Sequence, residues 1–167
     1  MNNYPDVIAR LDELTGAEPL VTDWMSISQI ETDVFAALTR DRALMHNDPV
    51  WAAKSPWGGT IVHGYHVLSM LPAAIDVLPI PAMDDDRSYA LNYGLNRVRI
   101  LNPLRVGHRF RIHTAVRSID DKGGNRFLIA LGHTVEVQGE AKPFLVAEAL
   151  VYFGIDQNLG QTTQLGT

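Results

Sequence analysis

The stretch Val67-Leu-Ser-Met-Leu-Pro72-Ala-Ala-Ile-Asp-Val-Leu78 has the pattern of a buried helix at the centre of a fold. Apolar residues recur at positions 67, 68, 71, 75 and 78, which predicts a helix with a broad buried face. Pro72 lies inside this run and cannot donate a hydrogen bond to the carbonyl of Leu68. We therefore expect a kink or a shift in hydrogen bonding at Pro72.

The chain changes its hydrophobic period after this helix. Apolar and polar residues alternate in segments 89–100, 110–117 and 127–137, and segment 144–153 is apolar on nearly both faces. Alternation predicts strands with one wet face, while the last segment is typical of a central strand. Gly94 lies where a bulge would absorb a slip in the phase of the first strand. The order predicts an α+β fold in which an antiparallel sheet wraps the helical segment 67–78.

Two shorter helices are expected before the central one. Ile8, Leu11 and Leu14 recur at helical spacing and are followed by Gly16, a common helix stop. A second apolar stripe, at positions 34, 35 and 38, follows Thr32-Asp33, either of which could cap its helix. This helix would place Asp41 at or just beyond its end.

Length and composition favour one domain. The chain has 167 residues, 46% of them hydrophobic, no cysteine and a net charge of −5. We expect an N-terminal helix and lead-in at residues 1–20, a single domain at 21–156 and a flexible polar tail at 157–167. The acidic balance argues against a nucleic-acid partner. The start does not resemble a secretory signal, and no run approaches the roughly 20 apolar residues of a membrane span, so a cytoplasmic protein without a membrane partner is expected.

Asp41, His46 and the pair His63-Gly64 supply a carboxylate, an imidazole and a backbone donor. Adding water to a polarised double bond, or removing it, needs a water activator, a proton relay and a group that stabilises an enolate oxygen. An amide at the start of a helix suits that oxygen because its N–H is unpaired, and Gly64 allows close approach. These residues predict hydration or dehydration chemistry.

The same residues carry a resemblance to a known family. Segments 35–41 (Phe-Ala-Ala-Leu-Thr-Arg-Asp), 46–49 (His-Asn-Asp-Pro) and 55–64 (Ser-Pro-Trp-Gly-Gly-Thr-Ile-Val-His-Gly) resemble the hydratase motif of MaoC-like dehydratases, which include (R)-specific enoyl-CoA hydratases. Segment 93–99 (Tyr-Gly-Leu-Asn-Arg-Val-Arg), with Pro103 and Val106-Gly107 after it, resembles the branch typified by nodulation protein N.

The resemblance implies a hot-dog fold, usually as a homodimer or a double-length equivalent. It also implies a hydro-lyase that interconverts trans-2-enoyl and (R)-3-hydroxyacyl thioesters of coenzyme A or acyl carrier protein. It implies no cofactor and no metal. Asp41 and His46 match the catalytic pair of the family, and Gly64 matches the residue whose amide polarises the thioester carbonyl.

Other residues are candidates for substrate binding. His63 could contact substrate or merely bond a neighbouring backbone group, and Ser69 could stand in for a serine that some family members have at the position of Pro72. Trp57 could line an acyl tunnel or pack within its loop. Arg97 and Arg99 could bind phosphates of the carrier or form a solvated strand face.

Further histidines have plainer interpretations. A metal site at His46, His63 and His66 matches no zinc spacing, so we predict none. His133, on an apolar strand face, is most simply a core or interface histidine with its hydrogen bonds satisfied.

Two alternatives to the hydro-lyase stay open. A hot-dog thioesterase would direct an activated water at the carbonyl carbon. A non-catalytic acyl-binding or dimer-partner module is the other, because many family members have Asn or Gln followed by Pro or Trp where this chain has Arg42-Ala43-Leu44-Met45.

Overall fold

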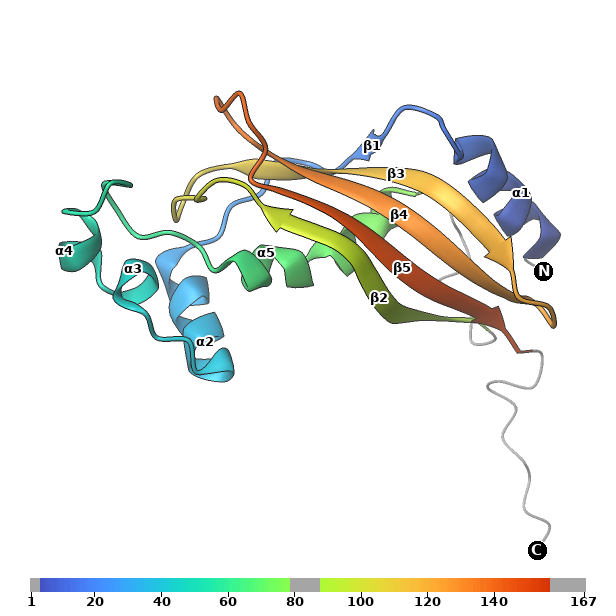
Figure 1. Cartoon of the computed structure of the whole chain (residues 1–167), viewed down its shortest axis with the longest axis horizontal. Helices are drawn as coiled ribbons and strands as arrows, with labels where there is room; N and C mark the ends of the chain where they lie inside the picture. The colour runs from blue at the N-terminus through green and yellow to red at the C-terminus, as the bar shows by residue number, and fades with distance from the viewer. Residues whose placement is uncertain (1–3, 79–87, 157–167) are drawn as a thin grey trace, which may run out of the picture.

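The computed structural model describes residues 4–78 and 88–156 (Figure 1). The elements, in chain order, are α1 (Tyr4–Leu14), β1 (Leu20–Val21), α2 (Gln29–Thr39), α3 (Leu44–Asn47), α4 (Pro49–Ala52), α5 (Gly64–Ser69), the 3₁₀ helix η1 (Leu71–Val77), β2 (Ser88–Ile100), β3 (Phe110–Asp121), β4 (Arg126–Val137) and β5 (Leu145–Ile155). The predicted tail at 157–167 lies outside the described residues.

One antiparallel sheet forms the body of the domain. Its strand order is β1-β3-β4-β5-β2, so β1 and β2 are the edge strands. The sheet curves over α5 and η1, as Figure 1 shows, which confirms the predicted α+β arrangement. Register shifts occur in β2 between Asn92 and Gly94 and between Leu95 and Arg97, so the bulge expected near Gly94 is present.

The central helix is broken at the position that Pro72 predicted. Segment α5 ends at Ser69, and the chain continues as the 3₁₀ helix η1 with Pro72 in its first turn. Proline fits the start of a helical segment because the N–H groups there have no intrahelical acceptor. The expectation of one long helix was therefore wrong, whereas the expected change in hydrogen bonding was right.

The apolar interior forms two clusters under the curved sheet. The first packs Val67, Leu71 and Ala74 of the central helices against Phe110 and other residues of β3, β4 and β5. The second joins Ile75 and Leu78 to the opposite ends of the same strands and includes Leu11 of α1, which is 1% exposed. Segment α1 is thus packed onto the domain rather than separate from it.

Helix α2 begins earlier than predicted. Ser28 is its cap: the Ser28 hydroxyl accepts from the Glu31 amide, and the Glu31 carboxylate accepts from the Ser28 amide at 2.7 Å. Capping by Thr32 or Asp33 was therefore a wrong expectation, because both lie inside the helix and Thr32 is fully buried.

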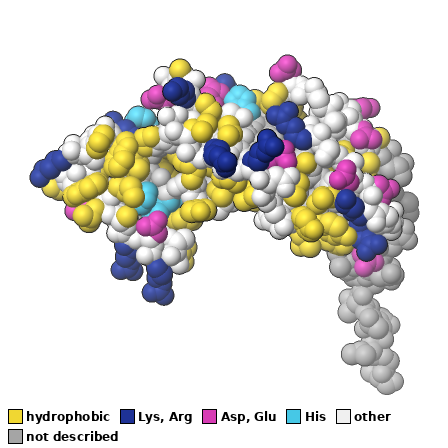
Figure 2. All heavy atoms as spheres, viewed as in Figure 1, with side chains coloured by type: hydrophobic (Ala, Val, Ile, Leu, Met, Phe, Trp, Pro, Cys, Tyr) yellow, Lys and Arg dark blue, Asp and Glu magenta, His cyan; other side chains and the backbone are white. Residues whose placement is uncertain are grey.

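The predicted apolar stripe of α2 faces outward. Val34 is 53% exposed and Leu38 76% exposed, so these side chains are not core residues of the single chain. Helices α2, α3 and α4 lie together at one end of the sheet, and hydrophobic side chains are grouped on that end (Figures 1 and 2). Among the helices in the described part of the chain, none is long and apolar enough to span a membrane.

Candidate active site

Asp41 lies just beyond the end of α2, as predicted. Helix α2 ends at Thr39, and Arg40 follows in the left-handed region with φ of 68°. This turn brings Asp41 to His63, whose Nε2 donates to the Asp41 backbone carbonyl at 2.9 Å and lies 3.9 Å from the Asp41 carboxylate. The Asp41 side chain is 54% exposed, so its carboxylate is open to solvent or substrate.

His46 is buried on the short helix α3, with 7% of its surface exposed. Its Nδ1 lies 2.7 Å from the carbonyl oxygen of Ile61, which can only accept, so Nδ1 carries the proton and Nε2 keeps a lone pair. Burial lowers the pKa of His46, and the nearby His63 lowers it further. His46 is therefore a neutral imidazole near neutral pH, with Nε2 able to act as a base.

The two imidazoles are stacked. The His46 and His63 ring centroids are 3.7 Å apart with 24° between the planes, and the ring of Phe35 lies 5.2 Å from that of His63. The His66 ring stacks on that of Phe35, with the ring centroids 4.6 Å apart. Among the described residues, His63 Nδ1 is buried without a hydrogen-bond partner. The stack fixes the plane of each ring next to Asp41.

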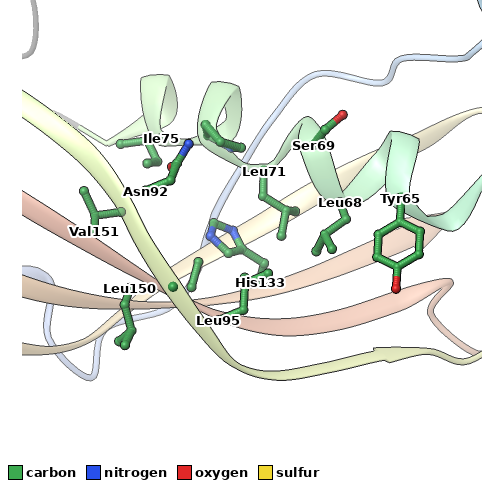
Figure 3. A pocket seen from close by; sticks show the side chains of 13 residues that line it. Tyr65, Leu68, Ser69, Leu71, Ile75, Asn92, Leu95, His133, Leu150 and Val151 are labelled. Atoms are coloured by element: carbon green, nitrogen blue, oxygen red, sulfur yellow. The ribbon is translucent and has the colours of Figure 1, made fainter. Parts of the chain in front are cut away.

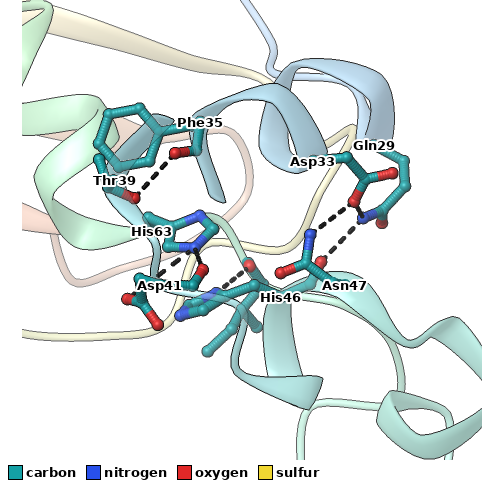
Figure 4. Close-up of polar contacts among 9 residues, drawn as sticks. Gln29, Asp33, Phe35, Thr39, Asp41, His46, Asn47 and His63 are labelled. Carbon is teal, nitrogen blue, oxygen red and sulfur yellow. Dashed lines mark hydrogen bonds and ion pairs between the residues drawn. The ribbon is translucent and has the colours of Figure 1, made fainter. Parts of the chain in front are cut away.

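A polar network ties α2 to the segment that holds His46 (Figure 4). The Gln29 amide donates to the His46 carbonyl and to Asp33, both at 2.8 Å, and its oxygen accepts from the Thr60 hydroxyl at 2.6 Å. Asn47 donates to the same Asp33 carboxylate at 2.7 Å. Asp41 and His46 are therefore carried on one cross-linked unit.

Gly64 is the first residue of α5, immediately after His63. No hydrogen bond from the Gly64 amide to another backbone group is present among the described residues, as expected for the first turn of a helix. A methyl group added at Gly64 would overlap the Cδ1 atom of Ile100. A side chain at this position would therefore displace Ile100 of β2, and the Gly64 amide has no backbone acceptor among the described residues.

The residues of this cluster are of the types that bind metal ions, but their rings are not oriented as metal ligands. One ligand atom from each of Asp41, His46 and His63 falls within 4.8 Å of the others. An imidazole lone pair lies in the plane of its ring, so two stacked rings aim their lone pairs side by side rather than at one ion. The arrangement fits proton transfer better than metal coordination.

A cavity of about 460 Å³ lies under the sheet, and no residue of the Asp41, His46, His63 and Gly64 cluster lines it (Figure 3). It lies between the central helices and strands β2, β4 and β5, and Tyr65, the residue after Gly64, is at one end. Its lining is mostly apolar, with Ser69, Asn92 and His133 as polar members. The volume is within the roughly 300–1,000 Å³ that small-molecule pockets occupy.

The remaining predicted substrate-binding residues lie elsewhere. Ser69 lines the cavity, although its hydroxyl donates to the His66 carbonyl at 2.6 Å. Trp57 lines a separate pocket of about 240 Å³ that also includes Arg105, His108 and Lys142. Arg97 and Arg99 are exposed and line a third hollow with Arg117 and Glu148. The structure therefore brings together Asp41, His46, His63 and Gly64, but not Trp57, Arg97 or Arg99.

Comparison with known proteins identifies the class. The curved sheet around a helix matches solved hot-dog structures, among them the (R)-hydratase from A. caviae involved in PHA biosynthesis, with a TM-score of 0.63, 21% identity and coverage of 80% of this chain and 94% of that one. The model of the MaoC like domain matches residues 11–137. The chain belongs to the MaoC-like dehydratase family.

Two named relatives cover nearly the whole chain. The 3-hydroxyacyl-thioester dehydratase Z of Mycobacterium tuberculosis is 36% identical over 147 residues, 87% of this chain and 95% of that protein. Nodulation protein N of Rhizobium leguminosarum bv. viciae is 32% identical over 154 residues, 92% of each chain. The resemblance drawn from the His-Gly motif and from segment 93–99 is confirmed.

Sequence reasoning missed three features of the site. The Ile61 carbonyl sets the tautomer of His46 but is a backbone atom without a sequence signal. Phe35 was predicted only as a member of an apolar stripe and of the family motif, and its ring lies against two histidines. His133 was expected to have its hydrogen bonds satisfied, yet within residues 4–78 and 88–156 only its Nδ1 has a partner, the Thr114 hydroxyl at 3.2 Å.

Proposed function

We propose that this protein catalyses the reversible hydration of trans-2-enoyl thioesters to (R)-3-hydroxyacyl thioesters. The observation that carries the proposal is the convergence of Asp41, His46 and His63 to within 4.8 Å, directly before the free amide of Gly64. The named activities of the dehydratase and hydratase relatives support it.

In the hydration direction, a water held between the Asp41 carboxylate and His46 Nε2 attacks C3 of the enoyl group. His46 suits the role of base because burial lowers its pKa and its Nδ1 proton is held by Ile61. The proton taken from water is returned by the same pair to C2. Because both groups lie on one side of the substrate, the addition is syn.

Electron density passes through the thioester oxygen during the step. The Gly64 amide is the donor we assign to that oxygen, because it has no backbone partner among the described residues and no side chain shields it. His63 is a positioning residue: it bonds the Asp41 carbonyl and stacks on His46, so it holds both groups of the pair.

We further propose that the active form is a homodimer joined through β2. This strand is a sheet edge, and Leu91, Tyr93 and Leu95 on it are 55%, 65% and 48% exposed. An open edge with apolar side chains can pair with a second copy. Light scattering on the purified protein tests this, and a Leu95→Lys variant should be monomeric; a monomeric parent protein contradicts it.

The acyl group is carried as a thioester by coenzyme A or by acyl carrier protein. Arg97 and Arg99 are the residues we propose to contact the phosphates of this carrier. Their hollow lies on the same edge strand that we assign to the dimer, so a partner copy could bring it near a catalytic cluster. Replacing both arginines with Gln should raise the KM for acyl-CoA and leave kcat nearly unchanged.

The decisive experiment measures loss of enoyl absorbance from crotonyl-CoA, with chiral analysis of the product. The parent protein should give the (R)-3-hydroxyacyl thioester, and Asp41→Ala or His46→Ala should lose about 10²–10⁴-fold in kcat/KM. Asp12→Ala, an exposed carboxylate on α1, is the matched control and should match the parent. Parental turnover by Asp41→Ala would overturn the site assignment, and release of free thiol would instead indicate a thioesterase.

A further inference from the structure

The cavity that Tyr65 and the central helices line contains a buried imidazole that the proposed hydration does not use. His133 is on the inner face of β4, is 2% exposed and lines the cavity together with Leu71 and Ile75 of η1. Figure 3 shows its ring among these apolar side chains, below the central helix. A polar ring in an apolar cavity is costly unless its nitrogens find partners.

The hydrogen bonds of this ring are only half satisfied. Nδ1 lies 3.2 Å from the Thr114 hydroxyl, and that hydroxyl in turn lies 3.5 Å from the Ala74 carbonyl. The carbonyl can only accept, so the chain of contacts has the Thr114 hydroxyl donating to Ala74 and His133 Nδ1–H donating to Thr114. Nε2 then keeps a lone pair, and it has no hydrogen-bond partner in the part of the chain that the structure describes.

A second polar side chain lines the same cavity, from a strand two places away in the same sheet. Asn92, on the edge strand β2, lines it at the bulge between Asn92 and Gly94, and Figure 3 shows its amide near Ile75. An amide offers both a donor and an acceptor. The cavity therefore presents two hydrogen-bonding groups on walls that are otherwise mostly apolar.

We propose that the acyl group of the natural substrate carries a neutral hydrogen-bonding substituent, a hydroxyl group, that binds His133 Nε2 and Asn92. The inference rests on the proposed function, since it assumes that the acyl chain enters the cavity from Gly64. The substituent is neutral because burial lowers the pKa of His133 to about 4, so the ring offers no positive charge to an anion.

The position of His133 also limits where the hydroxyl lies along the chain. The ring is level with Leu71 and Ala74, which follow Gly64 by seven and ten residues. At about 1.5 Å per residue along α5 and about 2.0 Å per residue along the 3₁₀ helix, this is roughly 11–18 Å from the amide assigned to the thioester oxygen. The hydroxyl is thus well beyond the reacting C2–C3 bond, and it is distinct from the hydroxyl that hydration creates at C3.

The test compares a matched series of trans-2-enoyl-CoA esters of one length, one unsubstituted and the others with a single hydroxyl moved along the chain. For the parent protein, one hydroxylated ester should have a kcat/KM roughly 3- to 10-fold above the unsubstituted ester, the range expected for one hydrogen bond. In His133→Leu the preference should disappear or reverse, while the unsubstituted ester is still turned over.

Asn92→Leu provides a second variant, because Asn92 is exposed in the single chain and belongs to neither apolar cluster. It should weaken the same preference. Calorimetric binding of saturated acyl-CoA and hydroxyacyl-CoA gives a readout that does not depend on turnover. Absence of all turnover would contradict the proposed function alone, whereas equal binding of hydroxylated and plain chains by the parent protein would overturn this inference and leave His133 Nε2 to a bound water.

Discussion

Acid should destabilise the folded protein through His133, and the size of the effect follows from its burial. An unfolded histidine takes up a proton near pH 6.5, but burial lowers the pKa of His133 to about 4 in the folded state. Between these two pKa values His133 is protonated in the unfolded chain but neutral in the folded chain. The free energy of unfolding therefore falls as the pH falls from about 6.5 to about 4. At about 1.4 kcal/mol for each unit of pKa difference, the two pKa values correspond to a loss of roughly 3 kcal/mol in the free energy of unfolding.

Urea unfolding of the parent protein and of His133→Leu at a series of pH values isolates this contribution. The stability advantage of the parent over His133→Leu should shrink by roughly 3 kcal/mol between about pH 7 and pH 4. Val135→Ala, two residues further along the same buried face of β4, is the matched control because neither residue titrates. A difference between parent and His133→Leu that stays constant with pH would refute the reasoning.

Three further results are expected. The pH profile of kcat/KM should fall on the acid side below pH 6.5, because burial lowers the pKa of His46; a midpoint at or above 6.5 would contradict this. Gly64→Ala should lose activity and about 1–3 kcal/mol of stability through overlap with Ile100, and Ile100→Ala in the same chain should restore stability in urea unfolding. Ser28→Ala should lower the free energy of unfolding by about 1 kcal/mol through loss of the α2 cap, which thermal melting can measure; an unchanged melting temperature would argue against the capping role.

Features set by neighbouring residues could be predicted from the sequence. Pro72 predicted the break in the central helix because its ring removes a backbone donor. Gly94 predicted the bulge in β2 because glycine, without a side chain, tolerates unusual backbone angles. The cap of α2 was wrongly placed at Thr32-Asp33, next to the apolar stripe, whereas the observed cap is Ser28, four residues before Thr32. The capping box of Ser28 and Glu31 is a local sequence pattern, so this cap was predictable from the sequence.

Features that depend on the path of the chain could not be predicted in the same way. Asp41 and His46 were predicted as the pair from motif and spacing, and they do lie close together, yet the tautomer of His46 depends on a carbonyl fifteen residues later, at Ile61. Arg97 and Arg99 alternate with apolar neighbours, and only the pairing of β2 with β5 decides that they line a different hollow from the catalytic cluster. The pairing of strands that are far apart in the chain is the feature hardest to predict from a single sequence.

The catalytic pair and the cavity lining come from different parts of the chain. Asp41 and His46 are in the cross-linked segment between β1 and α5, whereas His133 is in the sheet, on β4. If the proposed roles hold, a mutation at position 133 should alter which acyl groups fit without moving the pair proposed to activate water. This division allows selection to diversify substrate preference while the reaction itself is inherited intact, which is a route by which one small scaffold can supply enzymes for many acyl chains.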